Sequence, residues 1–341
     1  MITLPSVNRM FVLAARPKGV PTAANFRLIE APVPALDDGQ ALVRNQFMSV
    51  DPAQRGRMND AKSYTPPFQI DQPLEARAIG EVVASRNPAL PAGAIVQHRL
   101  GWRDYAVISE GTIVDTTLAP ASAYLGVLGG TGFAAYIGLV NIARVQPGET
   151  VFISGASGGV GCIAGQIVKL LGATAIGSTG SERNVPFLLD ELHYDRAFWA
   201  RDGSIAADLQ RVAPDGIDVY FDNVGGETLN AAFRSLRRRG RIAVCGMIAG
   251  YNGRVEGPSN IFMMMSKLLR MEGFLGSDHA PSFPAFLDLV APALRDGRIV
   301  APETIVDGLE NAPAALISLF DRGIKRGKLL VRLAGGPDAA A

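Results

Sequence analysis

The segment from Val151 to Gly161 constrains the fold of this chain more than any other. It reads Val-Phe-Ile-Ser-Gly-Ala-Ser-Gly-Gly-Val-Gly. The apolar run Val151–Ile153 predicts a buried strand, and the apolar run Cys162–Leu171 predicts a helix that begins directly after the glycines. A strand that enters a helix through a tight glycine-rich turn is typical of an α/β domain with a parallel sheet.

The glycines of this turn also indicate what it can bind. Gly158 lets an anion approach the backbone closely, and Gly161 lets the helix pack tightly on the strand. The first free N–H groups of the helix then point toward the anion. The pattern matches the dinucleotide-binding fingerprint G-x-G-x-x-G, except that Ala156 occupies the first glycine position. The alternative is an ordinary strand-to-helix turn without a ligand.

Strand and helix patterns alternate through the middle of the chain, whereas residues 1–120 contain short apolar runs between proline and glycine turns. The predicted strands are Val151–Ser154, Ala173–Gly177, Val219–Asp222 and Arg241–Cys245. The predicted helices are Phe133–Ile142, Cys162–Leu171, Val185–Glu191, Thr228–Ser235 and Ile261–Arg270. The fold class is therefore α/β: a doubly wound parallel sheet combined with a β-rich part.

Composition excludes several classes of protein. A chain of 341 residues is long enough for about two domains, and 48% hydrophobic with 19% charged residues excludes a disordered protein. A net charge of +1 without a long basic run predicts no nucleic-acid partner. The two cysteines, Cys162 and Cys245, do not form a disulfide framework, so a cytoplasmic protein is expected.

One stretch, Leu118–Ala143, carries no charge and is long enough to cross a bilayer. A proline and several glycines interrupt it, so we predict two buried elements joined by the turn Gly129–Gly132 and no membrane partner. Residues Met1–Arg16 also lack the pattern of a secretory signal.

The loop after the second strand of the α/β part favours NADP over NAD. An NAD-preferring domain places a carboxylate there to bind the ribose 2′-hydroxyl, but residues 177–181 read Gly-Ser-Thr-Gly-Ser. Arg183 follows, and a guanidinium matches the geometry of a phosphate. The alternative is a solvated surface arginine, and the neighbouring Glu182 weakens the phosphate interpretation.

Two further glycine-containing loops follow later strands. Asp222–Gly226 follows the third predicted strand, and Cys245–Asn252 follows the fourth. Ligands of open α/β sheets bind at the carboxyl ends of the strands, so both loops are candidates for the nicotinamide end of a dinucleotide. Either loop alone is also compatible with a plain turn.

With these segments in place, the chain resembles the medium-chain dehydrogenase/reductase superfamily. Within it, the chain is similar to the zinc-independent prostaglandin reductase, alkenal double-bond reductase and curcumin reductase group. The matching segments are Asn8-Arg9, Asp51-Pro52, Arg55–Met58, Ser63–Phe68, Gly80–Ser85, Gly130–Gly132, Ala135-Tyr136, Gly158–Gly161, Tyr220–Glu227, Cys245–Ile248, Tyr251-Asn252 and Gly327-Lys328.

The resemblance implies a GroES-like β-rich catalytic domain over 1–125 and 305–341 around a Rossmann NADP-binding domain over 126–304. It implies a homodimer that uses NADPH to reduce a carbon–carbon double bond conjugated to a carbonyl, with a small enone or enal as substrate. The residues it implies for the coenzyme are Gly158, Gly159, Val160, Gly161, Arg183, Asn223, Cys245, Gly246, Tyr251, Phe274, Leu275, Gly276 and Lys325.

The residues also predict that no metal takes part. Catalytic zinc needs three converging Cys, His or carboxylate ligands. Where zinc-dependent relatives place a cysteine and a His-Glu pair, this chain has Ser49 and Leu74–Arg77. The three histidines, His98, His193 and His279, lack metal-ligand spacing, and no C-x-x-C pair is present.

Conjugate reduction without a metal needs a neutral hydrogen-bond donor at the carbonyl oxygen, where negative charge develops. Tyrosine suits this role because its hydroxyl is neutral at pH 7. Tyr251 is the first candidate, because it matches the family tyrosine of the nicotinamide loop, and Tyr64 is the second. The alternatives are that Tyr251 caps its own loop and that Tyr64 only shapes the pocket.

Departures from the family pattern affect the coenzyme and the substrate. Asn184 stands where the family often has a lysine for the 2′-phosphate, and Arg183 or Arg201 could replace it. Lys325 stands where the family has asparagine, and Ala53 where a tyrosine is common. Two other functions stay open at this point: a quinone oxidoreductase, and a non-catalytic nucleotide-binding protein of the crystallin kind.

Overall fold

The computed structural model describes residues 6–253, 257–321, 323 and 326–333, which divide into two compact units. The first lies within Met1–Leu125, Thr304–Asp321 and Leu329–Ala341. The second lies within Gly126–Glu303 and Arg322–Lys328. The chain therefore passes from the first unit to the second and back, and a short segment near its end belongs to the second unit.

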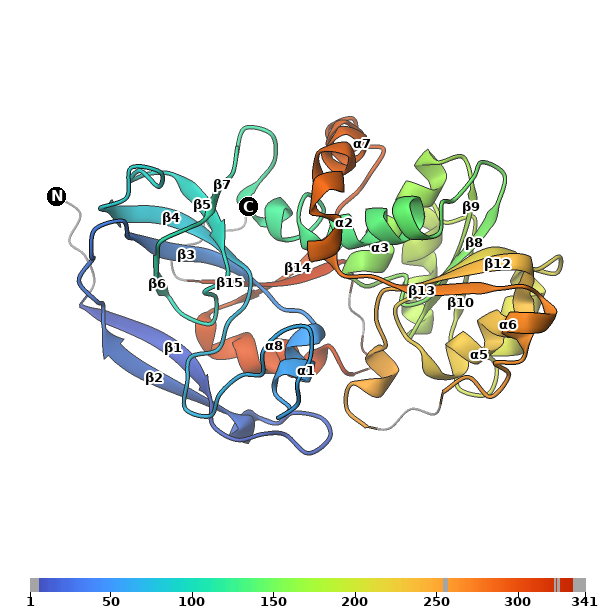
Figure 1. Ribbon diagram of the computed structural model, residues 1–341, viewed down its shortest axis with the longest axis horizontal. Coiled ribbons are helices and arrows are strands. Elements are labelled where there is room, and N and C mark those ends of the chain that lie inside the picture. The colour runs from blue at the N-terminus through green and yellow to red at the C-terminus, as the bar shows by residue number, and fades with distance from the viewer. Residues whose placement is uncertain (1–5, 254–256, 322, 324–325, 334–341) are drawn as a thin grey trace. The chain divides into compact units, whose positions relative to one another are not determined.

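The first unit is built mainly of antiparallel strands (Figure 1). Its small sheet pairs β1 (Val7–Leu13) with β2 (Phe26–Pro32). Its larger sheet has the order β14-β15-β3-β4-β5-β7, with β6 also paired to β3. The bounds are β3 Ala41–Ser49, β4 Ala78–Ser85, β5 Ile95–His98, β6 Tyr105–Ile108, β7 Thr112–Ile113, β14 Glu303–Asp307 and β15 Lys328–Arg332.

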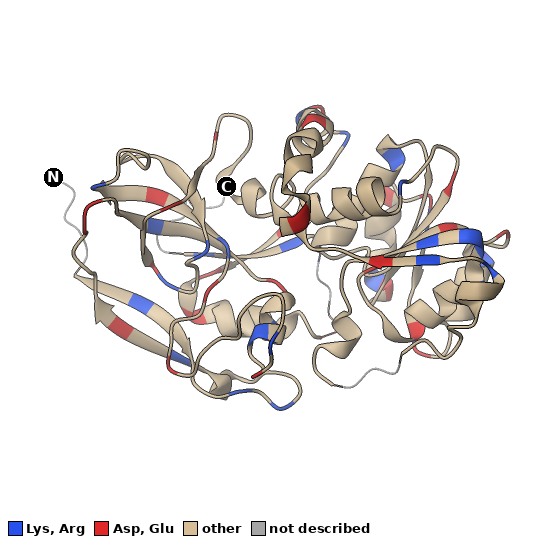
Figure 2. Cartoon of the chain, viewed as in Figure 1, with Lys and Arg blue, Asp and Glu red and all other residues tan. Residues whose placement is uncertain are grey.

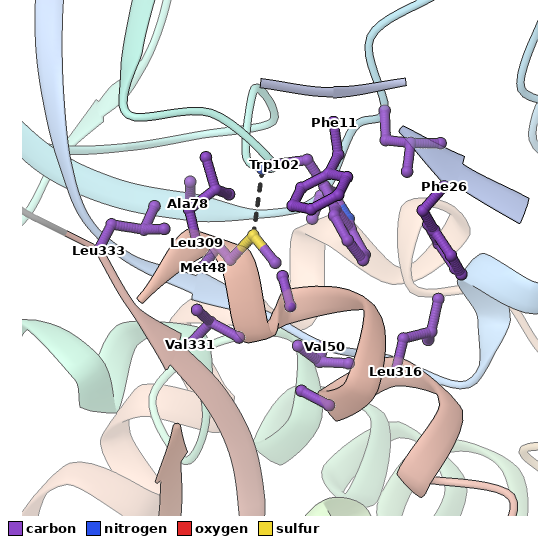
Figure 3. Close-up of a cluster of buried hydrophobic side chains, with 14 of the residues drawn as sticks. Phe11, Phe26, Met48, Val50, Ala78, Trp102, Leu309, Leu316, Val331 and Leu333 are labelled. Atoms are coloured by element: carbon purple, nitrogen blue, oxygen red, sulfur yellow. Dashed lines mark hydrogen bonds between the residues drawn. The ribbon is translucent and has the colours of Figure 1, made fainter. Parts of the chain in front are cut away.

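Aromatic and aliphatic side chains from both chain ends form the core of this unit (Figure 3). Trp102 is 1% exposed and stacks on Phe26 with ring centroids 5.7 Å apart, and its backbone N–H donates to the sulfur of Met48 at 3.1 Å. Leu316 of helix α8 (Ala312–Ser318) and Val331 of β15 pack into the same cluster. Burial of this apolar surface therefore holds the C-terminal helix and strand to the N-terminal strands.

The second unit contains a six-stranded sheet with the order β10-β9-β8-β11-β12-β13, in which every pairing is parallel. The bounds are β8 Thr150–Ile153, β9 Thr174–Thr179, β10 Arg196–Trp199, β11 Ile217–Asp222, β12 Leu236–Val244 and β13 Arg270–Gly273. The strand order reverses between β8 and β11. Ligands of doubly wound sheets bind at such a switch point.

Helices cover this sheet on both faces (Figure 1). Phe152 and Tyr220 face one side, where they form a core with Leu209 of α4 and Phe233 of α5. Phe221 faces the other side, against the π-helical turn Ile137–Ile142 that continues α2. The helix bounds are α1 Ala53–Arg57, α2 Gly130–Tyr136, α3 Gly159–Leu170, α4 Ile205–Val212, α5 Gly226–Ser235, α6 Met263–Ser266 and α7 Phe283–Arg295.

The predicted doubly wound sheet and the β-rich part are confirmed, with differences in detail. The predicted helix Ile261–Arg270 is wrong, because α6 covers only Met263–Ser266 and Arg270 already begins β13. Leu268, with φ of 54°, breaks the helical backbone between them. The predicted helix Val185–Glu191 is a π-helical turn over Phe187–Glu191. In the described part of the chain, none of the helices combines the length and apolar character needed to span a bilayer.

Candidate functional site

The turn after β8 has the close packing that an anion-binding turn needs. Gly155 adopts φ of +60°, and Gly158 forms the N-cap of α3. A Cβ atom at Gly161 would overlap the carbonyl oxygen of Gly155 and the Cα of Ala156, so only glycine fits there. The backbone N–H of Ala156 donates to the carbonyl oxygen of Ser178 at 2.8 Å, which ties the turn to β9.

The predicted residues Gly158, Gly159, Val160 and Gly161 thus form the start of α3, where free backbone N–H groups favour a phosphate. A Cβ at Gly159 would lie 3.2 Å from Thr131 and 3.4 Å from the side chain of Lys328. Lys328 is only 6% exposed. Sequence reasoning did not assign Thr131 or Lys328 to this turn, although Gly327-Lys328 was among the matching segments. The geometry fits the pyrophosphate of a dinucleotide.

The loop after β9 carries the residues predicted for the 2′-phosphate. Arg183 is exposed, and its guanidinium makes no hydrogen bond or ion pair with the residues that the structure describes. Asn184 is 1% exposed, and its amide donates to the hydroxyl of Ser157 at 3.3 Å. Arg201 instead stacks on Trp199, with the guanidinium carbon 5.2 Å from the ring centroid. The indole N–H of Trp199 donates to the carbonyl oxygen of Gly180 at 3.2 Å.

Arg326 reaches the same loop from the far end of the chain, and sequence reasoning missed it. Its Nη1 lies 3.2 Å from Oε1 of Glu191, and its Nη2 donates to the carbonyl oxygen of Arg183 at 3.4 Å. Its guanidinium carbon lies 4.8 Å above the ring centroid of Phe187. Lys325, predicted for the coenzyme, lies outside the described residues.

A buried hydrogen-bond network fixes the loop after β11. Oδ1 of Asp222 accepts from the hydroxyl of Tyr220 at 2.7 Å and from the backbone N–H groups of Val224 and Gly225 at 2.9 and 2.8 Å. The hydroxyl of Ser154 lies 3.3 Å from the same oxygen. Burial raises the pKa of Asp222 above its ordinary value despite these donors, because the carboxylate is 1% exposed.

This network positions the predicted residue Asn223. The amide side chain of Asn223 donates to the carbonyl oxygen of Ser154 at 2.8 Å, and its backbone N–H donates to the Ser154 hydroxyl at 3.0 Å. Ser154 comes directly after β8, so these bonds join the loops on either side of the switch point. The loop after β11 is therefore held in one arrangement against the glycine-rich turn.

The loop after β12 contains Cys245, Gly246 and Tyr251. The backbone N–H groups of Cys245 and Gly246 both donate to the carbonyl oxygen of Asp222, at 2.9 and 3.0 Å. Burial raises the pKa of the Cys245 thiol to about 12, which favours the protonated thiol at neutral pH. The hydroxyl oxygen of Tyr251 lies 3.4 Å from the backbone nitrogen of Met247, which places it against the start of its own loop.

The predicted residues Phe274, Leu275 and Gly276 follow β13 directly. The ring of Phe274 meets that of His279 edge to face, with centroids 6.5 Å apart. Because β8, β11, β12 and β13 are parallel neighbours, the loops that follow them lie at one edge of the sheet. The structure therefore places the predicted coenzyme residues of the loops after β8, β11, β12 and β13 at one edge of the sheet.

Tyr64, the second candidate donor, belongs to the first unit. It is 67% exposed and lies in an irregular segment after α1. Close by in the sequence, the guanidinium carbon of Arg57 lies 4.0 Å from the ring centroid of Phe68. An exposed tyrosine with this placement is accessible to a ligand.

Ser49, at one expected zinc position, and the histidine His98 make other contacts. The hydroxyl of Ser49 donates to Asp51 at 2.5 Å. Nε2 of His98 lies 2.9 Å from Oδ1 of Asn45, while Nδ1 accepts from the backbone N–H of Leu100 at 3.0 Å. Burial lowers the pKa of His98 to about 4. Among the described residues, no three His, Cys, Asp or Glu side chains converge as a metal site would require.

Basic residues gather on β12 (Figure 2). Two of them are paired: Arg237 with Asp218 and Arg241 with Glu149, each at 2.7 Å. Arg237–Arg239 stand at the amino-terminal end of the strand. This group therefore lies at the sheet edge opposite the candidate coenzyme loops.

Two family models match the chain. The model described as the N-terminal domain of oxidoreductase matches residues 9–115, and the model described as zinc-binding dehydrogenase matches residues 159–292. The second description names zinc, although the described residues contain no matching ligand group.

Curated relatives match over nearly the whole chain. A putative NADP-dependent oxidoreductase, YfmJ, of Bacillus subtilis is 43% identical over 94% of this chain and 96% of its own length. The NADP-dependent 2-alkenal reductase of Nicotiana tabacum is 36% identical over 95% of this chain and 97% of its own length. The NADPH-dependent curcumin reductase of Escherichia coli is 36% identical over 96% of this chain and 97% of its own length.

A solved structure agrees with these relatives. CurA from Vibrio vulnificus in complex with NADPH is 38% identical to this chain and superposes with a TM-score of 0.90. The match covers 95% of this chain and 99% of that one.

Proposed function

Because the chain belongs to the medium-chain dehydrogenase/reductase family, we propose that it reduces the carbon–carbon double bond of α,β-unsaturated aldehydes or ketones with NADPH. The observation that carries this proposal is the near full-length similarity to NADP-dependent reductases of alkenals and of curcumin. The second unit, within Gly126–Glu303 and Arg322–Lys328, would be the NADP-binding domain. The first unit, within Met1–Leu125, Thr304–Asp321 and Leu329–Ala341, would be the catalytic domain.

The loops at the carboxyl edge of the sheet would hold the coenzyme. Gly158 to Gly161 would hold its pyrophosphate on the backbone N–H groups of α3, and Arg183 would pair with its 2′-phosphate. The loops after β11, β12 and β13 would hold its nicotinamide end. When bound, NADPH supplies a hydride.

The chain's own contribution to the reaction is to stabilise negative charge on the carbonyl oxygen. Hydride addition to the β-carbon spreads charge into an enolate, and a neutral donor at the oxygen lowers that barrier. Tyr251 is the proposed donor. Its hydroxyl oxygen lies 3.4 Å from the Met247 backbone nitrogen, in a loop that the Asp222 carbonyl holds to the strand end. Tyr64 is the second candidate, since its side chain is exposed.

No metal is needed for this chemistry, because the enolate charge is delocalised and a hydroxyl can stabilise it. The places of zinc ligands in zinc-dependent relatives hold Ser49 and Leu74–Arg77, and Ser49 is bonded to Asp51. We therefore propose a zinc-independent reductase.

We also propose that the protein is a cytoplasmic homodimer. Strand β13 is an edge strand whose residues are all exposed, and nearby apolar side chains are exposed as well: Ile261, Phe262, Met265, Leu268 and Met271. Antiparallel pairing of β13 with a second copy, centred on Met271, would place Arg270 opposite Glu272 in both directions. Cys162 and Cys245 are free thiols, as a reducing compartment allows.

Light scattering after size exclusion tests the dimer. The wild type should elute as a dimer, and Met271→Lys should shift it toward a monomer. A monomeric wild type at micromolar concentration would contradict this arrangement.

Parallel turnover assays test the function. The purified protein is given NADPH or NADH with an alkenal, an enone and a quinone, and the products are identified. We expect saturated aldehydes and ketones with NADPH. Turnover of the quinone alone would indicate a quinone oxidoreductase, and no turnover would indicate a nucleotide-binding protein without catalysis.

A further inference from the structure

The segment Arg326–Lys328 is attached to the glycine-rich turn of the second unit. The backbone N–H of Gly327 donates to the carbonyl oxygen of Ser157 at 2.9 Å, and Gly327 forms a parallel bridge with Gly158. Gly327 has φ of +73°, and a Cβ there would overlap the carbonyl oxygen of Pro302. No other residue fits at this position, so the register that places Arg326 beside the turn is fixed.

From this position the guanidinium of Arg326 lies over the loop after β9. It lies 4.8 Å above the ring centroid of Phe187, which is 2% exposed. Its Nε points toward Oδ1 of Asn184 at 3.5 Å, and its other nitrogens contact Glu191 and the carbonyl oxygen of Arg183. Stacking on a buried ring fixes the plane of a guanidinium and so prepares it for a phosphate.

Three of the contacts that Arg326 makes are long or exposed. The pair with Glu191 is exposed, with side-chain exposures of 41% and 55%, and such pairs contribute little to stability. The contacts with the Arg183 carbonyl oxygen and with Oδ1 of Asn184, at 3.4 and 3.5 Å, are at the long limit of hydrogen bonds. A phosphate dianion could therefore take the place of these three contacts.

A second guanidinium lies in the same loop. Arg183 is one residue before Asn184, is exposed, and has no partner among the described residues, while Arg326 contacts its carbonyl oxygen. The loop after the second strand of a doubly wound sheet is where the 2′ position of the adenosine ribose binds. Two guanidinium groups at that place match the charge of one phosphate dianion.

We propose that Arg326 is a determinant of coenzyme specificity, which binds the 2′-phosphate together with Arg183. This proposal rests on the proposed use of NADPH. The competing explanation is that Arg326 only attaches its segment to the loop. The two explanations differ in one property: a structural attachment affects all adenine nucleotides equally, whereas a phosphate ligand affects only those with a 2′-phosphate.

Calorimetric titration with adenosine 2′,5′-bisphosphate and with 5′-AMP separates them. We expect Arg326→Gln to weaken binding of the bisphosphate about tenfold to a hundredfold, the range of one lost charge-assisted contact, and to change 5′-AMP binding less than about twofold. Arg211→Gln is the matched control, because Arg211 lies in the last turn of α4 and is 65% exposed. Equal losses for both nucleotides, or none, would overturn the proposal.

If Arg326→Gln does not fold, Glu191→Gln is the second variant that tests the proposal. This variant should fold, because the Glu191 side chain is 55% exposed. Removing this carboxylate takes away one competing partner of Arg326 and lowers the local negative charge, so the bisphosphate should bind about two- to fivefold more tightly. Unchanged affinity would overturn the proposal. A wild type that binds both nucleotides equally would instead contradict the NADPH assignment itself, before any variant is compared.

Discussion

The loops after β9 and after β11 lie at the same edge of one sheet, yet they are built in opposite ways. After β9, Arg183 is exposed. The ion pair of Arg326 with Glu191 is exposed as well, and its hydrogen bond to the Arg183 carbonyl oxygen is long. After β11, Asp222 is 1% exposed and accepts hydrogen bonds from Tyr220, Val224 and Gly225. In the proposed site, the phosphate end would therefore depend on surface side chains, whereas the reaction end would depend on a buried network.

The buried network should show the largest effect. Asp222→Ala leaves the donors of Tyr220, Val224 and Gly225 without their acceptor, and we expect the free energy of unfolding to fall by about 3–5 kcal/mol. Urea denaturation measures it. Asp296→Ala is the control, because that carboxylate is 48% exposed and its loss should cost less than about 0.5 kcal/mol. Similar losses in both variants would remove the distinction between the two loops.

The next effect should be on the rate. Tyr251→Phe removes one hydroxyl, so kcat for enone reduction should fall by about one to three decades while folding and NADPH affinity are retained. Steady-state kinetics measure kcat and the KM for NADPH, and thermal melting measures whether the variant is folded. Tyr64→Phe should reduce kcat less. If the Tyr64 variant were slower than the Tyr251 variant, the donor role would move to Tyr64.

A smaller and more selective effect is expected after β9. Arg183→Ala should raise the apparent KM for NADPH by about tenfold or more, since one charge-assisted contact contributes roughly 1.5–3 kcal/mol. The melting temperature should not change, because the side chain is exposed. An equal rise in KM for NADH would exclude a role at the 2′-phosphate.

The smallest expected effect is that of metal removal. Dialysis against a strong chelator should leave kcat and the melting temperature unchanged, because Ser49 and His98 are engaged in hydrogen bonds and do not converge with other ligands. A loss of activity that zinc restores would contradict the proposed zinc-independent reaction.

Much of the fold could be predicted because strong local patterns specify it. The glycine-rich turn between Val151 and Cys162 and the apolar strands around it required the doubly wound sheet that is observed. Strands β10 and β13 were not predicted. Both are only four residues long, and β13 is exposed along its whole length, so no alternation of apolar and polar residues marks it.

Residues of the candidate site could be predicted where a single continuous segment contains both the residue and the strand before it. Gly158, Asn223 and Tyr251 each follow a recognisable strand. Arg326 could not be found in this way, because 142 positions separate it from Asn184, and only the pairing of Gly327 with the glycine-rich turn brings them together. The contact of the Tyr251 hydroxyl with Met247 likewise depends on how the loop turns back on itself.

In the proposed reaction, hydride reaches the β-carbon of an enone. NADPH deuterated at C4 and a simple enone are incubated with the enzyme, and the product is examined by NMR. We predict a saturated ketone that carries deuterium at the β-carbon and an intact carbonyl group. An allylic alcohol that carries deuterium on the former carbonyl carbon would contradict the proposed conjugate reduction.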